Sequence, residues 1–349
     1  MEIVNNKILI TGAAGFIGSY LVSHLGINND LIIVDSLEYG GDILNLPTRY
    51  QNHLIQKDSS TLNERDINMS NIDFCIHLAG ISSLPENELD YSKAIHNNFV
   101  STVNVYELCT RIGVKKFLFA STSAVYENNK SLPFKEDESV SPDLMYSYSK
   151  KLCEDYLQFR GQKNDSIETH ILRFFNVFGP NQNTQRKNPP LTGYLLKCIE
   201  NNERAILYNN NPDVKRDYIY VEDLLQSIDT ILSSKERFHT NETWNITSGL
   251  SYSVYDIIQI METIFKRKLQ YEFKKPDNIW DKYPNISTKV NPERVAKEVF
   301  KSSSGSNGKL QQLLGNEYKF IDMAKGLKIM QEISSNKVNK FKGSDEFNA

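Results

Sequence analysis

Short apolar runs alternate with longer segments of helical periodicity along the first half of the chain. The apolar runs consist almost wholly of Ile, Val, Leu and Phe, without the polar alternation of a half-exposed strand, so we expect both faces of each strand to be buried. Runs of this kind predict strands at 7–12, 30–36, 53–58, 73–80, 115–122 and 169–177.

The segments between these runs carry apolar residues at helical spacing. They predict helices at 16–26, 90–113 and 145–161, and a polar stretch near 62–67 predicts a further helix or crossover. Strand alternating with helix is the pattern of a parallel sheet with helices on both faces. The sequence therefore predicts an α/β fold, a Rossmann doubly wound parallel sheet, over residues 1–178, with some return of the chain later.

The rhythm changes after Gly179, where Pro- and Asn-rich loops separate the remaining helices. This change predicts a smaller mixed C-terminal portion over 179–335. Within it we expect a flexible connection at 300–309 (FKSSSGSNGK), and after it a flexible tail at 336–349. The helices expected in this portion lie near 194–203, 221–234 and 253–265.

Composition narrows the classes of partner. The chain has 349 residues, of which 40% are hydrophobic, so it can bury a substantial core. Its formal net charge is -3, and charged residues of both signs are mixed along it. A nucleic-acid-binding protein carries a basic patch or stripe, which this sequence lacks. We therefore expect no nucleic-acid partner and favour small-molecule chemistry.

The N-terminus passes directly into a short apolar run, without a basic region or a cleavage-type stretch, and no segment is as long as a bilayer requires. We therefore predict a cytoplasmic protein with no membrane partner. The cysteines lie far apart, without a CxxC pair or a His at ligand spacing, so we expect core residues and neither a metal site nor a disulfide. They are Cys75, Cys109, Cys153 and Cys198.

The first strand runs into TGAAGFIG (11–18), a glycine-rich turn that opens a helix. Glycines let the backbone approach a pyrophosphate closely, and the free N–H groups at the start of the helix stabilise its charge. Glycines also cap helices and form tight turns, so the turn alone does not establish a nucleotide site. Its place between a strand and a helix favours a dinucleotide site formed by Gly12, Gly15, Phe16, Ile17 and Gly18.

Asp35 stands at the end of the second predicted strand. A carboxylate there can accept both hydroxyls of an adenosine ribose, although an Asp in an ordinary turn is the simpler interpretation. The glycine-rich turn and Asp35 together favour the cofactor. Ser36 and Leu37 follow, with no Arg to receive a 2′-phosphate, which favours NAD over NADP.

A set of motifs resembles the extended short-chain dehydrogenase/reductases, and within them the NAD-dependent nucleotide-sugar epimerase/dehydratase family. The motifs occur in the family's order over most of the chain, and their ordered coincidence is more specific than any one of them. They are TGAAGFIG (11–18), HLAG (77–80), STSAVY (121–126), YSYSK (146–150), RFFNVFGP (173–180) and RDYIYVED (216–223).

The resemblance implies a Rossmann domain that holds NAD and a C-terminal portion that holds a nucleotide-diphosphate sugar. By position, Asp58 would approach the adenine, and Asn98 would be the family's structural or cofactor-contacting Asn. The residues implied to pass beneath the cofactor are Leu78, Ala79 and Gly80.

Asn176 and Arg216 match positions that contact the diphosphate of the substrate in this family. A guanidinium aimed at phosphate is one interpretation of Arg216. A surface ion pair with Asp217 or Asp223 is the other.

Tyr146 and Lys150 occupy positions i and i+4 of a predicted helix, so they point the same way. A phenol with a pKa near 10 is a poor base, but a neighbouring ammonium and an oxidised nicotinamide favour the phenolate. Thr122 can position the same substrate hydroxyl for proton transfer. An exposed Tyr and a solvated Lys is the simple interpretation of YxxxK. The glycine-rich turn, Asp35 and Thr122 at matching places favour the catalytic interpretation. We therefore expect Thr122, Tyr146 and Lys150 to be catalytic. We also expect Tyr146 and Lys150 to contact NAD.

The residues after Thr122 bear on the reaction. Dehydratases that resemble this chain carry Asp-Glu there and related decarboxylases a Glu at the second place, whereas this chain has Ser123 and Ala124. The absence of these carboxylates disfavours dehydration and decarboxylation by the usual route. Among the reactions that the resemblance implies, it favours 4-epimerisation through a transient 4-keto sugar. The alternatives are a nucleotide-sugar dehydrogenase or ketoreductase, a 4,6-dehydratase and, from another class, a non-catalytic cofactor-binding regulatory protein.

The chain departs from the family pattern at several places. Tyr126-Glu127 replaces the usual Tyr-Gly, NNNPDVK replaces a Gly-Asp-Gly, and KKPDNIW replaces an Arg-Pro-Gly-Asp. The loop GPNQNTQRKNPP is similar to that of epimerases acting on UDP-N-acetylhexosamines or UDP-uronic acids. Family members often pair through two long helices, and the segments 91–112 and 146–160 therefore predict a homodimer through a four-helix bundle.

Overall fold

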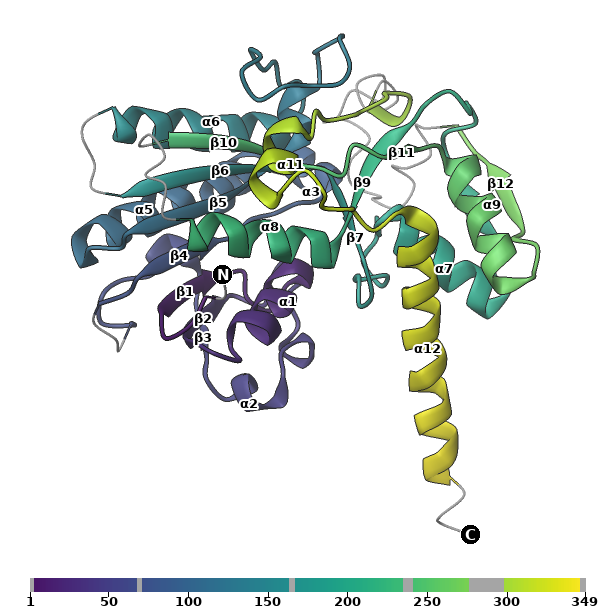
Figure 1. The fold of residues 1–349 in the computed structure, drawn as a ribbon, viewed down its shortest axis with the longest axis horizontal. Coiled ribbons are helices and arrows are strands. Elements are labelled where there is room, and N and C mark those ends of the chain that lie inside the picture. Colours follow the sequence, from purple (N-terminus) through teal and green to yellow (C-terminus); the bar gives the residue numbers. More distant parts are fainter. Residues whose placement is uncertain (1–2, 68–70, 163–166, 235–240, 276–297, 346–349) are drawn as a thin grey trace.

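A large parallel sheet forms the centre of the protein, with helices on both of its faces and a smaller mixed portion at one end (Figure 1). The computed structural model describes residues 3–67, 71–162, 167–234, 241–275 and 298–345, with side chains to residue 335.

Within the described residues the main sheet has seven strands, all joined in parallel. This is the Rossmann-like α/β arrangement that the sequence predicts. The order across the sheet is β10 (Asn241–Ile246), β6 (Glu168–Phe174), β5 (Lys116–Thr122), β4 (Phe74–His77), β1 (Lys7–Thr11), β2 (Asp30–Asp35) and β3 (Leu54–Gln56).

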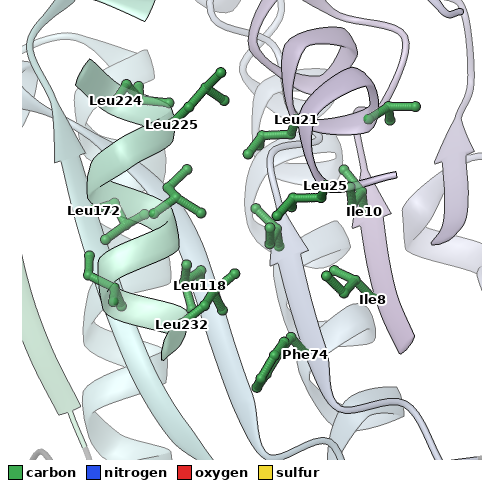
Figure 2. Packing of buried hydrophobic residues seen from close by; sticks show 14 of the residues in the cluster. Ile8, Ile10, Leu21, Leu25, Phe74, Leu118, Leu172, Leu224, Leu225 and Leu232 are labelled. Carbon is green, nitrogen blue, oxygen red and sulfur yellow. The ribbon is translucent and has the colours of Figure 1, made fainter. Parts of the chain in front are cut away.

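Alternate residues of the central strands enter different hydrophobic layers, which explains why these strands are nearly all apolar. Ile8 and Ile10 of β1 pack beneath α1 (Phe16–Leu25) and α8 (Val221–Ser233), as Figure 2 shows. Leu9, between them, belongs to the opposite layer, with α5 (Ser101–Ile112) and α6 (Met145–Gly161). Polar residues at either set of positions would lose hydrogen bonds to water, so the sheet requires both faces to be apolar.

The cysteines are buried in these layers, as predicted. Cys75, Cys109 and Cys153 belong to the layer beneath α5 and α6, and Cys198 to the core of the C-terminal portion.

Two features of the sheet differ from the sequence prediction. The run predicted as one strand over 169–177 divides at Phe175, because the Phe175 N–H bonds to Ile246 O (3.1 Å) and the chain then enters a second sheet as β7 (Asn176–Phe178). The sequence also did not predict β10, which pairs with β6. β10 and α8 form the return of the chain to the Rossmann portion.

The helix predicted over 90–113 is interrupted. It forms α4 (Tyr91–Ala94), a π-helical segment η3 (Ile95–Val100) and α5. A π-helical segment inserts an extra residue into the turn and is often found at functional sites. Between β3 and β4 the polar stretch near 62–67 forms a crossover after a 3-10 turn, η2 (Ser59–Thr61).

The C-terminal portion has a hydrophobic core of its own, which includes residues from Phe178 to Met330. In one small sheet β9 (Arg216–Tyr220) lies between β7 and β11 (Ser251–Tyr252), and in the other β8 (Ala205–Leu207) pairs with β12 (Tyr271–Phe273). The helices around this core are α7 (Leu191–Asn201), α9 (Val254–Phe265) and α12 (Met323–Asp345), whereas α11 (Gly308–Leu314) packs against α8 and β10 of the Rossmann portion.

Four further short elements of the described residues precede α6. They are η1 (Ile43–Asn45), α2 (Thr48–Gln51), α3 (Leu84–Leu89) and η4 (Ser123–Tyr126).

The flexible connection predicted at 300–309 is wrong for residues 303–306, which are held on both sides. Phe134 N bonds to Ser304 O and Ser306 N to Phe134 O, each at 2.8 Å. Asp217 N also bonds to Ser303 O at 2.8 Å. Ser and Gly suggested flexibility, but the backbone groups here find partners, and small residues let the chain pass between neighbours: a Cβ on Gly305 would lie 2.5 Å from the Phe175 ring.

The tail predicted from residue 336 begins inside α12, which continues to Asp345 and projects from the body of the protein (Figure 1). Among the described residues, no helix is long and apolar enough to cross a membrane.

Asp217 gives this packing a measurable pH dependence. Its side chain is buried under residues 303–305, and desolvation raises its pKa to about 7. A carboxyl whose pKa is raised on folding contributes stability below its unfolded pKa and loses it as the pH rises through the folded value. Relative to wild type, we therefore expect Asp217→Asn to gain unfolding free energy between pH 4 and 7, by at most about 4 kcal/mol.

Urea unfolding of both proteins across this pH range measures the difference. Asp213→Asn, on an exposed loop nearby, is the matched control and should show a flat difference. A flat difference for Asp217→Asn as well would contradict the buried-carboxyl explanation.

Candidate active site

A cavity of about 540 Å³ opens at the carboxyl ends of the parallel strands and extends to the C-terminal portion. Ligands of open α/β sheets bind at this edge, where loops from successive strands converge. Predicted site residues that line the cavity are Gly12, Gly15, Phe16, Ile17, Gly18, Asp35, Asp58, Leu78, Ala79, Gly80, Thr122, Tyr146, Lys150 and Asn176.

The glycine-rich turn is packed too tightly for side chains. Gly12 has φ +71°, and a Cβ there would lie 2.8 Å from Ala79 N. A Cβ on Gly18 would lie 2.1 Å from Gly12 O. Gly15 caps α1 without a side-chain hydrogen bond, so the cavity faces a helix N-terminus whose first N–H groups suit a phosphate.

Asp35 is held at the end of β2 by backbone donors. Ala14 N donates to its Oδ2 at 2.9 Å and Leu37 N to its Oδ1 at 2.8 Å. A Cβ on Gly41 would lie 2.6 Å from Oδ1, so the chain passes directly over the carboxylate. Burial raises the pKa of Asp35, and these backbone hydrogen bonds lower it. The site therefore presents a fixed carboxylate where a ribose would lie.

Asn98 does not line the cavity but supports its floor. Its Oδ1 accepts the Ile81 N–H at 2.8 Å, and its Nδ2 donates to Ser149 Oγ at 2.8 Å. It therefore ties the turn at Gly80 to α6 from within η3. Of the two roles that the sequence left open, this geometry is the structural one.

His77 packs in the same region, fully buried at the end of β4. Its Nδ1 lies 2.6 Å from Thr11 Oγ1 and its Nε2 lies 3.1 Å from Thr102 Oγ1. Burial and the nearby Lys150 charge lower its pKa to about 3, so it stays neutral near pH 7. It joins β1 to α5 and takes no part in the cavity lining.

Thr122 and Tyr146 meet across the cavity from the end of β5 and the first turn of α6. Burial raises the pKa of the Tyr146 phenol, while a hydrogen bond with Thr122 and the charge of Arg186 lower it. Lys150 donates instead to Ala120 O at 2.9 Å and lies 4.8 Å above the Phe119 ring. The effect of Lys150 on the pKa of Tyr146, which the sequence predicts, stays a prediction.

The two residues predicted to contact the substrate diphosphate, Asn176 and Arg216, differ in their position relative to the cavity. Asn176 lines the cavity, and its Nδ2 donates to Asp217 O at 2.8 Å. Arg216 is not among the described lining residues: its Nη2 donates to Glu298 O at 2.5 Å and lies 3.4 Å from Glu298 Oε1. The ion-pair interpretation of Arg216 therefore describes this geometry, with Glu298 as the partner in place of Asp217 or Asp223.

The family is identified by comparison. A model of the NAD dependent epimerase/dehydratase family matches residues 8–247. The chain belongs to this family. It is an extended short-chain dehydrogenase/reductase and a family enzyme that uses NAD.

Relatives of this family member carry different activities. A Methanocaldococcus jannaschii protein, provisionally assigned as a UDP-glucose 4-epimerase, is 30% identical over 80% of this chain and 90% of its own. The dTDP-D-glucose 4,6-dehydratase of Dictyostelium discoideum is also 30% identical, over 72% of this chain and 60% of its own.

Solved structures support the fold. The UDP-glucose 4-epimerase of Thermotoga maritima superposes with a TM-score of 0.80 at 23% identity, covering 95% of this chain and 99% of that chain. The UDP-glucuronic acid 4-epimerase of Bacillus cereus, solved with UDP-glucuronic acid and NAD, gives 0.76 at 24% identity, covering 94% and 99%.

The residues of this family member fit NAD. The turn at Gly12 and Gly18 has no room for side chains, the N-terminus of α1 faces the cavity, and Asp35 presents its carboxylate beside it. These are the features that accommodate a pyrophosphate and an adenosine ribose.

Sequence reasoning missed several lining residues, which lie in loops, in η3 or in the first turns of α3 and α7. Their local sequence predicts at most the element and not its place in the fold, so only the tertiary structure brings them to the cavity. They include Ser82, Glu86, Asn97, Gln182, Arg186 and Thr192. The loop composition after Gly179 was the only signal for the last three.

The close approach at Gly12 predicts that a methyl group there prevents cofactor binding. We expect Gly12→Ala to weaken NAD binding by at least about tenfold, since its Cβ pushes Ala79 out of place and narrows the turn. Gly113→Ala is the matched control: Gly113 also has a positive φ, at +74°, but nothing lies within 4 Å of its added Cβ.

Both variants should lose about 1 kcal/mol from backbone strain, and Gly12→Ala more. Calorimetric titration with NAD and thermal unfolding separate the two effects. Equal NAD affinity in the Gly12 variant and the control would contradict the position of the cradle.

Proposed function

We propose that this protein is an NAD-dependent nucleotide-sugar 4-epimerase that acts through a transient 4-keto sugar. The observation that supports this most strongly is that Thr122, Tyr146 and Lys150 line one cavity together with the glycine cradle, with Thr122 near enough to lower the pKa of the Tyr146 phenol. The relatives named above include 4-epimerases.

In this proposal Tyr146 removes the proton of the sugar C4 hydroxyl. Thr122 holds that hydroxyl and the phenol in line, so that the proton transfer occurs within one hydrogen bond. NAD, when bound, supplies a reversible acceptor for the C4 hydride. Tyr146 then returns the proton after the ketosugar has turned, so no net oxidation results.

The charges around Tyr146 suit a group that must both take and return a proton. Burial opposes ionisation of the phenol, whereas Thr122 and Arg186 favour it, and both effects act on the pKa of the same oxygen. Lys150 lies on the cavity floor, where its ammonium can hold the ribose of the cofactor. We assign it this holding role in addition to the predicted catalytic one.

Dehydration needs a further acid and base near C5 and C6. Ser123 and Ala124 follow Thr122 in η4, neither is a carboxylate, and neither is among the described lining residues. These positions favour retention of the ketosugar and its reduction on the opposite face.

One observation favours a second candidate, a 4,6-dehydratase. Glu86, in the first turn of α3, lines the cavity, and α3 lies against the start of α6 through the Glu88 side chain. The other lining carboxylates among the described residues are Asp35, Glu38 and Asp58, toward the adenosine end. Glu86 is therefore the carboxylate that a dehydration would use.

For the substrate we propose a nucleotide-diphosphate sugar, with Asn176 near the diphosphate and Arg216 released from Glu298 to join it. UDP-N-acetylhexosamines and UDP-uronic acids are the first sugars to test. Solved structures of similar fold include a UDP-N-acetylglucosamine 4-epimerase and a UDP-glucuronic acid 4-epimerase. A cytoplasmic location remains part of the proposal.

The direct test incubates the purified protein with UDP-, GDP-, CDP- and dTDP-sugars, separates the products by chromatography and follows absorbance at the NADH wavelength. An epimerase gives a product of equal mass and no net NADH. A product lighter by one water would indicate the dehydratase, and stoichiometric NADH formation or consumption a dehydrogenase or ketoreductase. Absence of turnover with every sugar would favour a non-catalytic protein.

Tyr146→Phe should retain NAD binding and lose turnover. The ring still fills its place, but no group remains to carry the proton, and general acid-base catalysis contributes about 10²- to 10⁴-fold. Steady-state kinetics and NAD titration of the same preparation provide the measurement. Turnover at the wild-type rate would refute the proton-transfer role.

A homodimer through α4, α5 and α6 is a further expectation. Large hydrophobic side chains are exposed at Tyr91 of α4, at Val100, which ends η3 just before α5, and at Tyr148 and Phe159 of α6. Light scattering at micromolar concentration should give twice the chain mass, and Phe159→Glu should reduce it because a charge would be buried at the contact. A monomer at these concentrations for the wild-type protein would overturn the expectation.

A further inference from the structure

Glu127 stands where the family pattern has glycine, and the structure gives its side chain a definite task. It is the residue immediately after η4, the turn that begins after Thr122, and its residue surface is only 5% exposed. Its Oε2 accepts the N–H groups of Asp143 (2.6 Å) and Leu144 (2.8 Å) and the hydroxyl of Ser147. One carboxylate oxygen therefore holds residues on both sides of Tyr146.

Helix α6 needs such a partner because its own sequence offers no cap. Its N-cap residue is Leu144, which makes no side-chain hydrogen bond. Ser, Thr, Asp or Asn normally satisfies the first N–H groups of a helix. Here Glu127 supplies the acceptor for the N–H groups before the helix, and Glu88 Oε1 accepts the Met145 N–H at 2.5 Å.

The other end of this connection is rigid. Glu127 N donates to Ala124 O at 3.0 Å. The preceding residue, Tyr126, stacks on Phe134 at 4.8 Å and donates to Asn245 Oδ1 at 3.0 Å. Arg173 Nη1 donates to the Tyr126 hydroxyl at 2.6 Å. These contacts hold the backbone of Glu127 in place at the end of the turn that follows β5.

We propose that Glu127 is a positioning residue for the 4-epimerase reaction, which ties the turn after Thr122 to the start of α6 and so keeps the Thr122 hydroxyl and the Tyr146 phenol in one geometry. This inference rests on the proposed function. Misplacement of a catalytic group by about 1 Å can cost about 10²-fold in rate, which gives such a tie its value.

The Glu127 carboxylate also acts on the ionisation of Tyr146, so its effect extends beyond the backbone N–H groups that it binds. Its charge raises the pKa of Tyr146, against the effects of Thr122 and Arg186. Burial raises the pKa of Glu127 itself, and Glu298 adds to this. Its Oε1 is buried without a hydrogen-bond partner among the described residues.

Other charged groups lie near Glu127 and Tyr146 and must stay unchanged in any test of their interaction. Lys301 donates to Tyr126 O at 2.7 Å, Glu88 binds at the helix start, and Lys150 lies one turn along α6. None of them is altered in the test below, so a change in the pKa of Tyr146 can be attributed to position 127 and to Thr122.

The test measures how strongly Thr122 and Tyr146 are coupled. Tyrosine labelled with ¹³C at Cζ is incorporated, the protein is saturated with NAD, and the Tyr146 signal, assigned by its loss in Tyr146→Phe, is titrated by NMR. Thr122→Val removes the hydrogen bond and should raise the pKa of Tyr146 by about one unit in the wild-type background. In Glu127→Ala the same substitution should raise it by much less, because the two groups have already separated.

Glu127→Gln retains an acceptor oxygen and should restore the coupling, while it lowers the pKa of Tyr146 because the charge is gone. Glu138→Ala, in the same loop, is the matched control and should leave both quantities unchanged, because the described partners of the Glu138 side chain are Asn129 and Lys135 N and neither is near Tyr146 in the chain. An equal effect of Thr122→Val in the wild-type and Glu127→Ala backgrounds would overturn the proposal.

If Glu127→Ala fails to unfold cooperatively, Glu127→Asp replaces it. Its shorter carboxylate cannot reach both sides of Tyr146, so the coupling should fall below that in Glu127→Gln; coupling as large as in wild type would overturn the proposal. With the substrate found in the sugar panel, kcat of Glu127→Ala should fall about 10- to 100-fold with KM changed less than about twofold. A change confined to KM would also contradict it.

The NMR arm requires no sugar turnover. No turnover of any sugar, together with coupling that depends on Glu127, would remove the proposed 4-epimerase and leave the positioning geometry. Turnover with coupling that does not depend on Glu127 would do the reverse.

Discussion

The contact between the Thr122 hydroxyl and the Tyr146 phenol, which lowers the pKa of that phenol, joins two elements that different forces hold in place. Thr122 ends β5, whose residues are all buried in the centre of the sheet, and it is fixed by two-sided hydrophobic packing. Tyr146 lies in the first turn of α6, where packing ends and polar contacts begin. The proposed proton transfer depends on keeping these two ends together, and the carboxylates of Glu127 and Glu88 hold the helix start.

The cofactor side of the cavity is organised by close backbone contact. Parallel strands bring the turn at Gly12 against Ala79, and the distance between them excludes a side chain. Asn98 then fixes the next turn from behind, through Ile81 and Ser149. Because Ser149 lies on α6, the turn at Gly80 and the helix that carries Tyr146 are parts of one hydrogen-bonded unit.

The sequence predicted the sheet well because two-sided burial leaves a strong apolar pattern in β1, β2, β4 and β5. β10 escaped prediction because NETWNI is half polar, and its pairing with β6 depends on residues far away in the chain. The segment 303–306 looked flexible from its Ser and Gly content. Its order comes from backbone hydrogen bonds to Phe134 and Asp217, which composition does not encode.

The same division applies to the site. Spacing and motif order located the glycines, Asp35 and the Tyr146 pair, whereas Glu127, Glu86 and Arg186 reach their places only through the fold. The most direct measurement uses the nucleotide sugar that proves to be the substrate, deuterated at C4, with the NAD-loaded protein in ordinary water. We predict an epimer of unchanged mass that retains deuterium at C4, because one cavity removes and returns the same hydride. Deuterium lost to solvent, or a product lighter by one water, would contradict it.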